Sequence, residues 1–400
     1  MTWKHYSLEQ SAARFDESED LTVGVEEEFQ ILDADSLELV NRFEELYEAA
    51  RMKLGPFVSG ELIASEIEVR TGKHKSLAGA EADLKDKLSG LLEAAEKAGL
   101  ALGASGTHPF SSWTNTRILN TPHYRAVEES LKYCAWRNLT FGMHAHIGVR
   151  GHERMISVFN SLRGYMPHLL ALSANSPFAE GYYTYLHSTR AQMFTRSFPR
   201  CNVPGAFNGW KDYASLIEMY FQTGSITEPT QVWWSLRPHP LLGTIEVRIC
   251  DCQSAVADTM AIAALAIALV AQLCEDHDSG MKLSVQTVNQ LEENLWRATR
   301  YGLAGKLVDF TRLKEAPATE TILTLIDYTA GVHSRLGLAD YIARIPAILE
   351  EGNGAQKQIR VYEQTGDVES VNADAVSRSL FKYGLNDMRK ATTEGREKTG

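Results

Sequence analysis

The chain has 400 residues, of which 44% are hydrophobic and 23% are charged, and its formal net charge at pH 7 is −11. This composition is that of an ordinary globular protein, and the acidic balance argues against a nucleic-acid-binding surface, which needs a basic face. Small anionic substrates are not excluded, because a few arginines or a metal ion can reverse the charge within a cleft. Residues 1–20 are polar and acidic, so we expect a polar lead-in and no signal peptide.

The cysteines and one apolar stretch bear on the cellular compartment. The five cysteines are Cys134, Cys201, Cys250, Cys252 and Cys274. Their odd number and their spacings match neither a disulfide framework nor a zinc site, so we expect reduced thiols and a cytoplasmic protein. The apolar stretch Ala255–Cys274 is interrupted by Asp258 and Gln272, and we predict a buried helix and no membrane span.

The first predicted strand covers Gly24–Leu32 and reads GVEEEFQIL. Because side chains alternate between the two faces of a strand, Glu26 and Glu28 share one face. Glu27 points to the opposite face, together with the apolar residues of the strand. One face of this strand is therefore acidic.

A second polar strand is predicted within Phe57–Thr71. Its alternation places Glu66, Glu68 and Arg70 on one face, and Glu61 lies just upstream in a less certain conformation. Carboxylates therefore line one face of this strand as well.

Two later stretches repeat this design with histidines and an arginine. They are Gly142–Arg150, which reads GMHAHIGVR, and Gly243–Asp251, which reads GTIEVRICD. His144 and His146 point the same way along the first, while the residues between and beside them point the other way. Glu246 and Arg248 share a face of the second. Four half-polar strands predict a sheet whose open face is an active site.

Apolar periodicity divides the rest of the chain into helices and short strands. Helices are predicted at residues 41–53, 77–99, 152–171, 213–223, 255–274, 285–301, 319–336, 338–352 and 371–382, and strands at 100–104 and 233–240. We expect one catalytic α+β domain over residues 21–385, with a sheet-forming body to about residue 250 and a helical part packed behind the same sheet. Residues 386–400 form a charged tail.

The sharpest constellation on these strands consists of carboxylates and imidazoles. Its members are Glu26, Glu28, Glu68, Glu246, His144 and His146. Carboxylates crowded in one cleft repel each other and stay ionised only when cations compensate them. Oxygen ligands with some imidazole favour Mg²⁺ or Mn²⁺ over zinc. The alternative is an ordinary solvent-facing side on each strand, but such sides usually mix in Lys, Thr and Ser.

Arginines provide candidate anion clamps, because a guanidinium grips phosphate or carboxylate with paired donors. The candidates are Arg190, Arg237, Arg248 and Arg300. The sequence contains no Walker loop, no dinucleotide-binding GxGxxG and no GxSxG nucleophile elbow. The chemistry therefore depends on the carboxylates, histidines and arginines.

A series of motifs makes the sequence resemble a known family. In order, they are GVEEEF, the segment from Glu61 that ends in EVRT, GTHPF, GMHAHIGV, SANSPF, RPHP, TIEVRICD and ENLWRATRYGLAG. The series resembles the bacterial carboxylate–amine ligases of the glutamate–cysteine ligase type 2 family, from about Leu21 to about Gly305. The resemblance implies a glutamine-synthetase-like fold, in which an antiparallel sheet forms a saddle with helices on one face. It also implies ATP, Mg²⁺ (with Mn²⁺ as the alternative) and an acyl-phosphate intermediate.

The resemblance extends the set of expected site residues. It adds Glu61 to the metal ligands, beside Glu26, Glu28, Glu68, His144, His146 and Glu246. We expect catalytic roles for Arg248, Arg237 and Arg300. We expect substrate or ATP binding by Arg190, Asn175, Asn294, Arg297 and His108. Glu27 and Glu66 sit where the family pattern is not reliably acidic, so neither receives a role.

We therefore expect an ATP-dependent ligase that joins the carboxylate of glutamate to cysteine or another amine. Its partners would be small molecules and no nucleic acid, and a homodimer is the default assembly. Two other interpretations stay open. A metal-dependent amide hydrolase would turn over without ATP, and a metal- or amino-acid-binding protein would be stabilised by its ligand without releasing ADP. Of the two histidines, we expect one to contact metal or phosphate, with His144 favoured, and the other to orient a neighbour.

Overall fold

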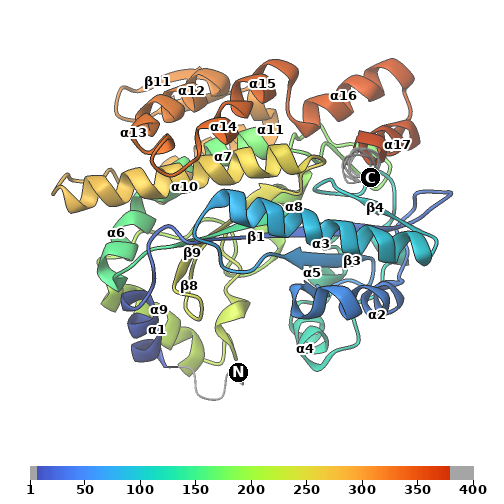
Figure 1. Cartoon of the computed structure of the whole chain (residues 1–400), viewed down its shortest axis with the longest axis horizontal. Helices are drawn as coiled ribbons and strands as arrows, with labels where there is room; N and C mark the ends of the chain where they lie inside the picture. The colour runs from blue at the N-terminus through green and yellow to red at the C-terminus, as the bar shows by residue number, and fades with distance from the viewer. Residues whose placement is uncertain (1–6, 379–400) are drawn as a thin grey trace, which may run out of the picture.

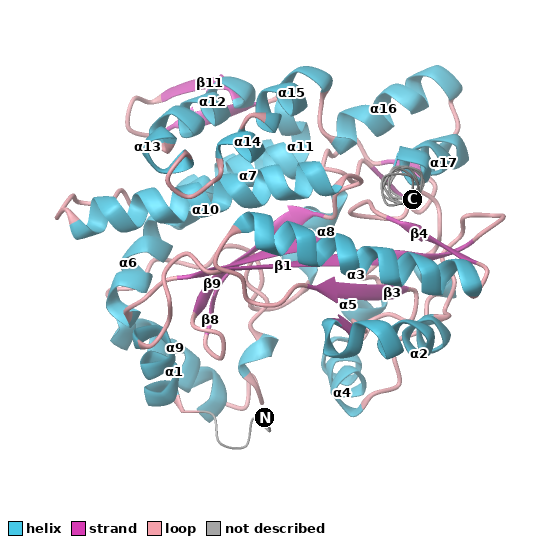
Figure 2. Ribbon diagram, in the orientation of Figure 1, coloured by secondary structure: helices cyan, strands magenta, loops and turns pink. Residues whose placement is uncertain are grey.

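The computed structural model describes residues 7–378 and is built around one antiparallel sheet (Figure 1). The strand order is β2-β3-β1-β5-β9-β8, and β4 pairs with the far half of β1. The strands are β1 (Val23–Asp33), β2 (Val58–Ser59), β3 (Glu66–Arg70), β4 (Leu100–Gly103), β5 (Gly142–Gly148), β8 (Leu236–His239) and β9 (Thr244–Asp251). Helices cover one face of this sheet (Figure 2), which confirms the predicted α+β class.

The stretch Phe57–Thr71 is the one predicted strand that is wrong as a continuous element. Only Val58–Ser59 and Glu66–Arg70 join the sheet, and the residues between them leave it. The reason is tertiary, because the backbone N–H of Ala64 donates to the carbonyl of Arg117 in a distant loop. The other predicted strands are confirmed, with small shifts at their ends.

The covered face of the sheet forms the hydrophobic core. The apolar side chains that alternate with the polar ones are buried there, among them Val25, Ile67 and Ile147. Each stabilises the fold by about 1.5–3 kcal/mol when it leaves water. Helices α3 (Leu77–Lys97) and α10 (Val256–Asp278) lie across this face (Figure 1). By length and composition α10 could span a membrane, but 83% of its apolar window is buried in the protein, so it is the predicted core helix.

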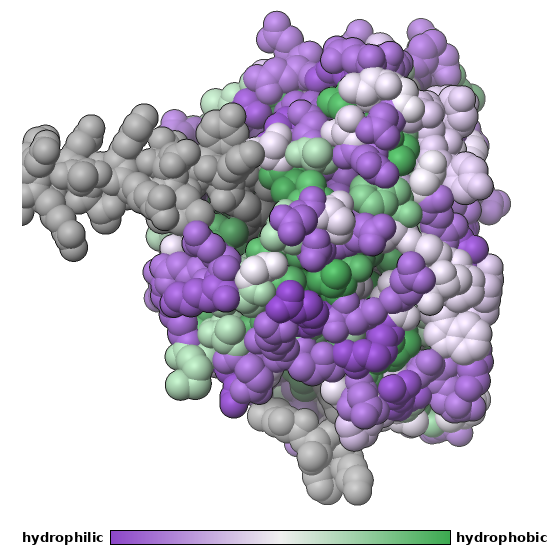
Figure 3. Space-filling model, turned by 90° about the vertical axis from the view of Figure 1, so that its right-hand side faces the viewer, coloured by the Kyte–Doolittle hydropathy of each residue, from purple (hydrophilic) through white to green (hydrophobic). Residues whose placement is uncertain are grey.

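Some of the remaining helices form a second layer behind α10, and the others form the two ends of the molecule (Figure 1). They are α1 (Leu8–Asp16), α2 (Phe43–Leu54), α4 (Pro122–Leu131), α5 (Tyr133–Trp136), α6 (His152–Leu162), α7 (Met166–Ser173), α8 (Thr189–Ser197), α9 (Trp210–Gln222), α11 (Val288–Tyr301), α12 (Ala318–Tyr328), α13 (Ala330–His333), α14 (Ala339–Ile342), α15 (Arg344–Glu351), α16 (Gly354–Thr365) and α17 (Val368–Arg378). At the end that carries α2 and α17, hydrophilic residues surround the apolar patches (Figure 3).

Several helical predictions differ from the structure in detail. The helix expected at residues 152–171 is divided into α6 and α7 by a tight turn, with Pro167 in the first turn of α7, where a proline is tolerated. The helices expected at residues 319–336 and 338–352 are each divided in two, and the sequence did not predict α1, α4, α5, α8 or α16. It also did not predict two small hairpins, β6 (Phe178–Ala179) with β7 (Tyr182–Tyr183), and β10 (Lys306–Asp309) with β11 (Lys314–Pro317). Residues 379–382 of the last predicted helix and the charged tail lie outside the described residues.

Candidate active site

The open face of the sheet is the floor of a cavity of about 500 Å³. Side chains from β1, β3, β5, β8 and β9 line it, and residues of α4 and α8 and of the loop after α9 complete its walls. Ten of the residues expected from the sequence line this cavity. They are Glu26, Glu28, Glu61, Glu68, His144, His146, Arg190, Arg237, Glu246 and Arg248.

The strand register brings these residues together. In a sheet, directly opposite residues on neighbouring strands have their Cβ atoms about 4.5–5.5 Å apart. The opposed pairs on the cavity floor are Glu28–Glu68, Glu26–His144, His146–Glu246 and Arg237–Glu246. Residues that are far apart in the sequence therefore share one polar surface.

A bulge in β9 places Arg248 beside this surface. Met143 pairs with Cys250 and Ala145 pairs with Val247, so two residues of β9 lie opposite the single residue His144. The side chain of Arg248 still points into the cavity, where its Nη1 donates to Glu246 over 2.5 Å. The predicted shared face of Glu246 and Arg248 is thus present, although the ladder is irregular.

One end of the cavity, here called the acidic end, is formed by four carboxylates. They are Glu28, Glu61, Glu66 and Glu68. Burial and the charge of Glu28 raise the pKa of Glu61 to about 7. Burial and the surrounding carboxylates also raise the pKa values of Glu66 and Glu68 well above their ordinary value. Without a bound cation, these four groups cannot all be ionised at neutral pH at low cost.

The other end, here called the arginine end, compensates its own charges. It consists of Glu26, Glu246, His146, Arg237 and Arg248. Arg237 donates to both oxygens of Glu246, over 2.7 and 3.1 Å. Burial alone would raise the pKa of Glu246, but Arg237 and Arg248 outweigh it and hold that pKa well below its usual range. Burial would likewise raise the pKa of Glu26, but His146 and His144 outweigh it and hold that pKa well below its usual value.

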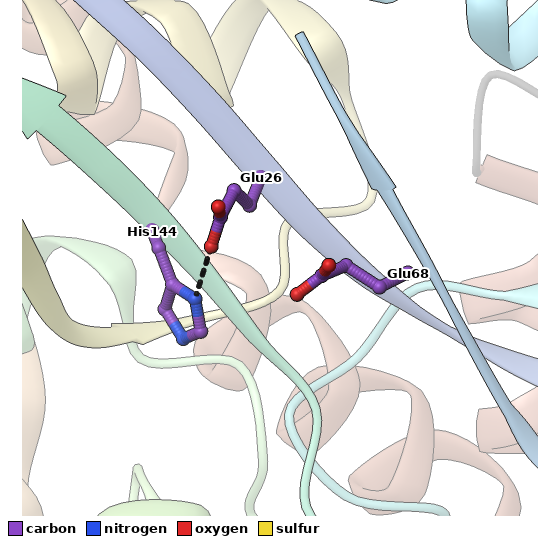
Figure 4. Close-up of side chains that lie close together, drawn as sticks. All are labelled: Glu26, Glu68 and His144. Carbon is purple, nitrogen blue, oxygen red and sulfur yellow. Dashed lines mark hydrogen bonds and ion pairs between the residues drawn. The ribbon is translucent and has the colours of Figure 1, made fainter. Parts of the chain in front are cut away.

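The donors present suit divalent cations. Three groups of ligand atoms lie within 4.8 Å of one another, and they are Glu26–Glu68–His144, Glu26–His146–Glu246 and Glu28–Glu61–Glu68. Figure 4 shows the first, with the carboxylates of Glu26 and Glu68 and the ring of His144 facing a common space. Within residues 7–378, the Nε2 atoms of His144 and His146 are buried and form no hydrogen bond, although they lie 3.5 Å from an oxygen of Glu28 and 3.3 Å from an oxygen of Glu26, respectively. Buried nitrogens of this kind and carboxylate oxygens match the ligands of Mg²⁺ or Mn²⁺ sites.

Five residues expected at the site do not line this cavity. Asn175 donates to the carbonyls of Ala104 and Cys252, and His108 contacts the carbonyl of Leu37 and the side chain of Asn372. Both are buried at structural positions.

The other three lie on α11, away from the sheet. Asn294 exchanges two hydrogen bonds with the backbone of Val308 in hairpin β10–β11. Arg297 pairs with Glu293 and Glu315, and Arg300 donates to the carbonyl of Tyr185. The motif ENLWRATRYGLAG thus fastens a helix to its neighbours, and it supplies no side chain to this cavity.

The SANSPF turn, which contains Asn175, acts on the cavity through Asp251. This carboxylate is fully buried and accepts hydrogen bonds from the backbone N–H of Asn175 and from the hydroxyls of Ser176 and Ser188. One of its oxygens lies 3.9 Å from Nη1 of Arg190, which lines the cavity. Asp251 therefore opposes the charge of Arg190 from behind the cavity wall.

The cavity also contains residues to which the sequence analysis gave no role. They include Glu66, Arg70, His123, Tyr124, Phe194, Phe198, Glu228, Trp233 and His239. Glu66 could have been found, because it shares a strand face with Glu68. His239 follows Arg237 on β8, and it also borders a second cavity of about 490 Å³ that shares Glu26, Arg70 and His146 with the first.

Glu27 lies on the opposite face of β1, as the alternation of side chains predicted. Its carboxylate lies in the core and accepts a hydrogen bond of 2.6 Å from the hydroxyl of Thr259 on α10. Burial raises the pKa of Glu27 to about 7, although the hydrogen bond from Thr259 opposes the shift. Glu27 takes no part in the cavity.

Comparison with known proteins agrees with this geometry. The family model of the glutamate–cysteine ligase family 2 matches residues 22–374. The chain belongs to this family. Among other members, a protein of Solibacter usitatus provisionally named glutamate–cysteine ligase 2 is 38% identical over 91% of this chain and 94% of its own length. A protein of Rubrobacter xylanophilus, provisionally named glutamate–cysteine ligase 2-2, is 36% identical over 90% and 91%.

Solved structures share the fold of this glutamate–cysteine ligase family 2 member. The glutamate–cysteine ligase of Francisella tularensis, solved in complex with AMP, has a TM-score of 0.66 and 12% identity, and the match covers 96% of this chain and 95% of that chain. A bifunctional glutathione synthetase of Pasteurella multocida has a TM-score of 0.64 and 14% identity, and the match covers 93% of this chain and 53% of that chain. These likenesses show that the chain shares the fold of the Francisella tularensis glutamate–cysteine ligase.

Proposed function

We propose that this glutamate–cysteine ligase family 2 member is an ATP-dependent carboxylate–amine ligase. The expected reaction transfers the γ-phosphoryl group of ATP to a substrate carboxylate, after which an amine displaces phosphate to form an amide. Glutamate with cysteine, or glutamate with another amine, is the substrate pair that the family name favours. The observation that carries the proposal is the meeting of an acidic end and an arginine end in one cavity on the sheet of this family.

Carboxylates of both ends and the two histidines would hold Mg²⁺, or Mn²⁺ in its place. The expected ligands are Glu26, Glu28, Glu61, Glu68, His144, His146 and Glu246. When bound, the metal would supply charge neutralisation for the phosphates, which is the main requirement of phosphoryl transfer. Support comes from the three ligand groups and from the two buried imidazole nitrogens that form no hydrogen bond among the described residues.

The arginines would orient the anionic groups. Arg237 and Arg248 are held by Glu246, so their guanidinium groups lie in fixed positions at the cavity surface. Arg190 is held from behind by Asp251 and by the carbonyls of Arg248 and Ile249. Side chains fixed in this way lose little entropy when they bind phosphate or carboxylate.

We assign the adenosine part of ATP to the second cavity. Its walls include Val23, Pro56, Phe57 and Leu242, which suit an uncharged base and sugar. It adjoins the main cavity at His146, so a nucleotide held there could extend its phosphates towards the metal ligands. The carboxylate and the amine would then occupy the main cavity. A cytoplasmic location and a homodimer complete the proposal.

The test is a screen for phosphate release with ATP and Mg²⁺ held constant, in which carboxylates are varied against amines. We expect release only when both a carboxylate and an amine are present, with formation of the corresponding amide. Amide cleavage in the absence of ATP would favour the hydrolase instead. Thermal stabilisation by amino acids without any ADP release would favour a binding protein.

A further inference from the structure

Glu66 is a buried carboxylate of the cavity that none of the proposed roles uses. Its side chain is 2% exposed and lines the acidic end. No hydrogen bond or ion pair joins its carboxylate to another residue in the part of the chain that the structure describes. A buried carboxylate without a donor is costly, so this group indicates a ligand that would complete it.

The neighbours of Glu66 explain why it has no partner. Gln30 lies directly opposite on β1, but its amide N–H groups donate to the carbonyl and the hydroxyl of Ser105. Arg190 is in the same cavity, but it donates to the carbonyls of Arg248 and Ile249 and its charge is opposed by Asp251. Gln30 therefore gives no donor to Glu66. The charge of Arg190 lowers the pKa of Glu66, but Arg190 forms no hydrogen bond or ion pair with it in the described part of the chain.

The candidate cation sites also leave Glu66 out. Each of the three groups of ligand atoms is made from other carboxylates and the two histidines, and Glu66 belongs to none of them. Its strand neighbour Glu68, in contrast, takes part in two groups and also accepts hydrogen bonds from Ser59 and Arg70. Metal ions at those sites would therefore be bound by other ligands and would leave Glu66 without a direct cationic contact.

We propose that Glu66 binds the amine substrate in its protonated form and makes the site selective for cationic amines. The inference rests on the proposed ligase function. An ammonium group supplies up to three N–H donors and one positive charge, which matches a buried carboxylate that has no partner. Glu66 shares a strand face with Glu68, so an amine held there would lie beside the expected metal ligands. Transfer of one proton from the ammonium group to the Glu66 carboxylate would free the nitrogen lone pair for attack on the activated carboxylate.

The test compares a cationic with an uncharged nucleophile. Hydroxylamine is largely uncharged at neutral pH and traps an acyl phosphate as a hydroxamate. In Glu66→Gln, the KM for the best amine of the screen should rise at least about tenfold, while the KM values for ATP and the carboxylate stay near those of the parent. Hydroxamate formation should fall much less than amide formation. Glu27→Gln makes the same change on the opposite face of β1 and should leave the KM for the amine unaltered.

Equal losses with hydroxylamine and with the amine would overturn the proposal and place Glu66 in the phosphoryl-transfer step. An unchanged KM for the amine would overturn it as well. A binding measurement covers the case in which the parent shows no turnover at all, which would contradict the proposed function instead. Methylammonium chloride should raise the melting temperature of the parent above the effect of equal sodium chloride. It should not do so for Glu66→Gln, and an equal increase in both proteins would refute an ammonium site at Glu66.

Discussion

The acidic end and the arginine end of the main cavity lie on the same sheet but are stabilised in opposite ways. At the arginine end, each carboxylate has a cationic partner within the protein, as Glu246 has in Arg237 and Arg248. At the acidic end, the carboxylates face one another, and Arg70 approaches Glu68 only to 3.4 Å. The arginine end balances the charges of its carboxylates within the protein, whereas the acidic end requires cations from solution.

Ligation of a carboxylate to an amine requires one site to bind both anions and cations, and the two ends of the cavity divide these tasks. Fixed guanidinium groups recognise anions without a cofactor. Crowded carboxylates recognise cations, which include both metal ions and ammonium groups. A single cavity can thus hold polyanionic phosphates and a positively charged nucleophile side by side. The following experiments would break or sharpen this division, from the largest expected effect to the smallest.

Removal of divalent metal should have the largest effect, because it leaves the acidic end without counterions. Excess chelator should abolish ATP turnover, and added Mg²⁺ should restore it. Mg²⁺ alone should also raise the melting temperature, since it offsets repulsion among Glu28, Glu61 and Glu68. Full turnover in excess chelator would contradict the division between the two ends.

Glu28→Gln should be the most damaging single substitution. Glu28 accepts a hydrogen bond from the backbone N–H of Gly142 and lies 3.5 Å from Nε2 of His144, so it links the acidic end to β5. We expect ATP turnover to fall about 100-fold, which corresponds to about 2.7 kcal/mol of barrier. Circular dichroism and the melting temperature should stay close to those of the parent. A loss of only a few-fold would show that this carboxylate is not a principal ligand.

Substitutions of the two histidines should differ in their effect on turnover, because His144 approaches the acidic end and His146 belongs to the arginine end. His144 contacts Glu26 over 3.1 Å and approaches Glu28, whereas His146 lies 3.3 Å from Glu26 and 3.8 Å from Glu246. Turnover of His144→Ala and His146→Ala should differ by at least about tenfold, or about 1.4 kcal/mol, with the larger loss at His144. A phosphohistidine trapped with labelled ATP would contradict this and indicate a covalent route.

Glu27→Gln should have the smallest effect on turnover, within a few-fold of the parent, because Glu27 points away from both ends. Its effect on stability should depend on pH. The pKa of Glu27 is raised from 4.5 to about 7 by burial, so between these values the folded state keeps a proton that the unfolded state has lost. The free energy of unfolding therefore falls as the pH rises through this window, in total by about 3 kcal/mol.

The glutamine variant should lack this contribution. It should consequently be more stable than the parent at pH 8 and differ least from it at pH 4.5, as measured by urea unfolding at both pH values. A stability difference that is the same at both pH values would mean that Glu27 ionises in the folded protein as it does in the unfolded chain.

The sequence by itself determined which face of each strand is polar. Alternation is a local property of the extended chain, so the placement of Glu26, His144 and Glu246 towards one surface, and of Glu27 towards the other, was predictable from residue order alone. The same holds for α10, whose largely apolar sequence predicts burial. The resemblance to the family followed from short motifs, and five of the eight motifs contain cavity residues.

Only the tertiary structure decided how these faces meet. The strand register, the bulge opposite His144 and the detour that carries Glu61 to the acidic end depend on contacts between distant segments, which local periodicity does not encode. For the same reason, Asn175 and Asn294 resembled ligand-binding residues in their motifs although they hold loops and helices in place. Glu66 is the converse case. The sequence does not distinguish it from the neighbouring carboxylates Glu61 and Glu68, and only the described part of the folded chain shows that it lacks a hydrogen-bond or ion-pair partner.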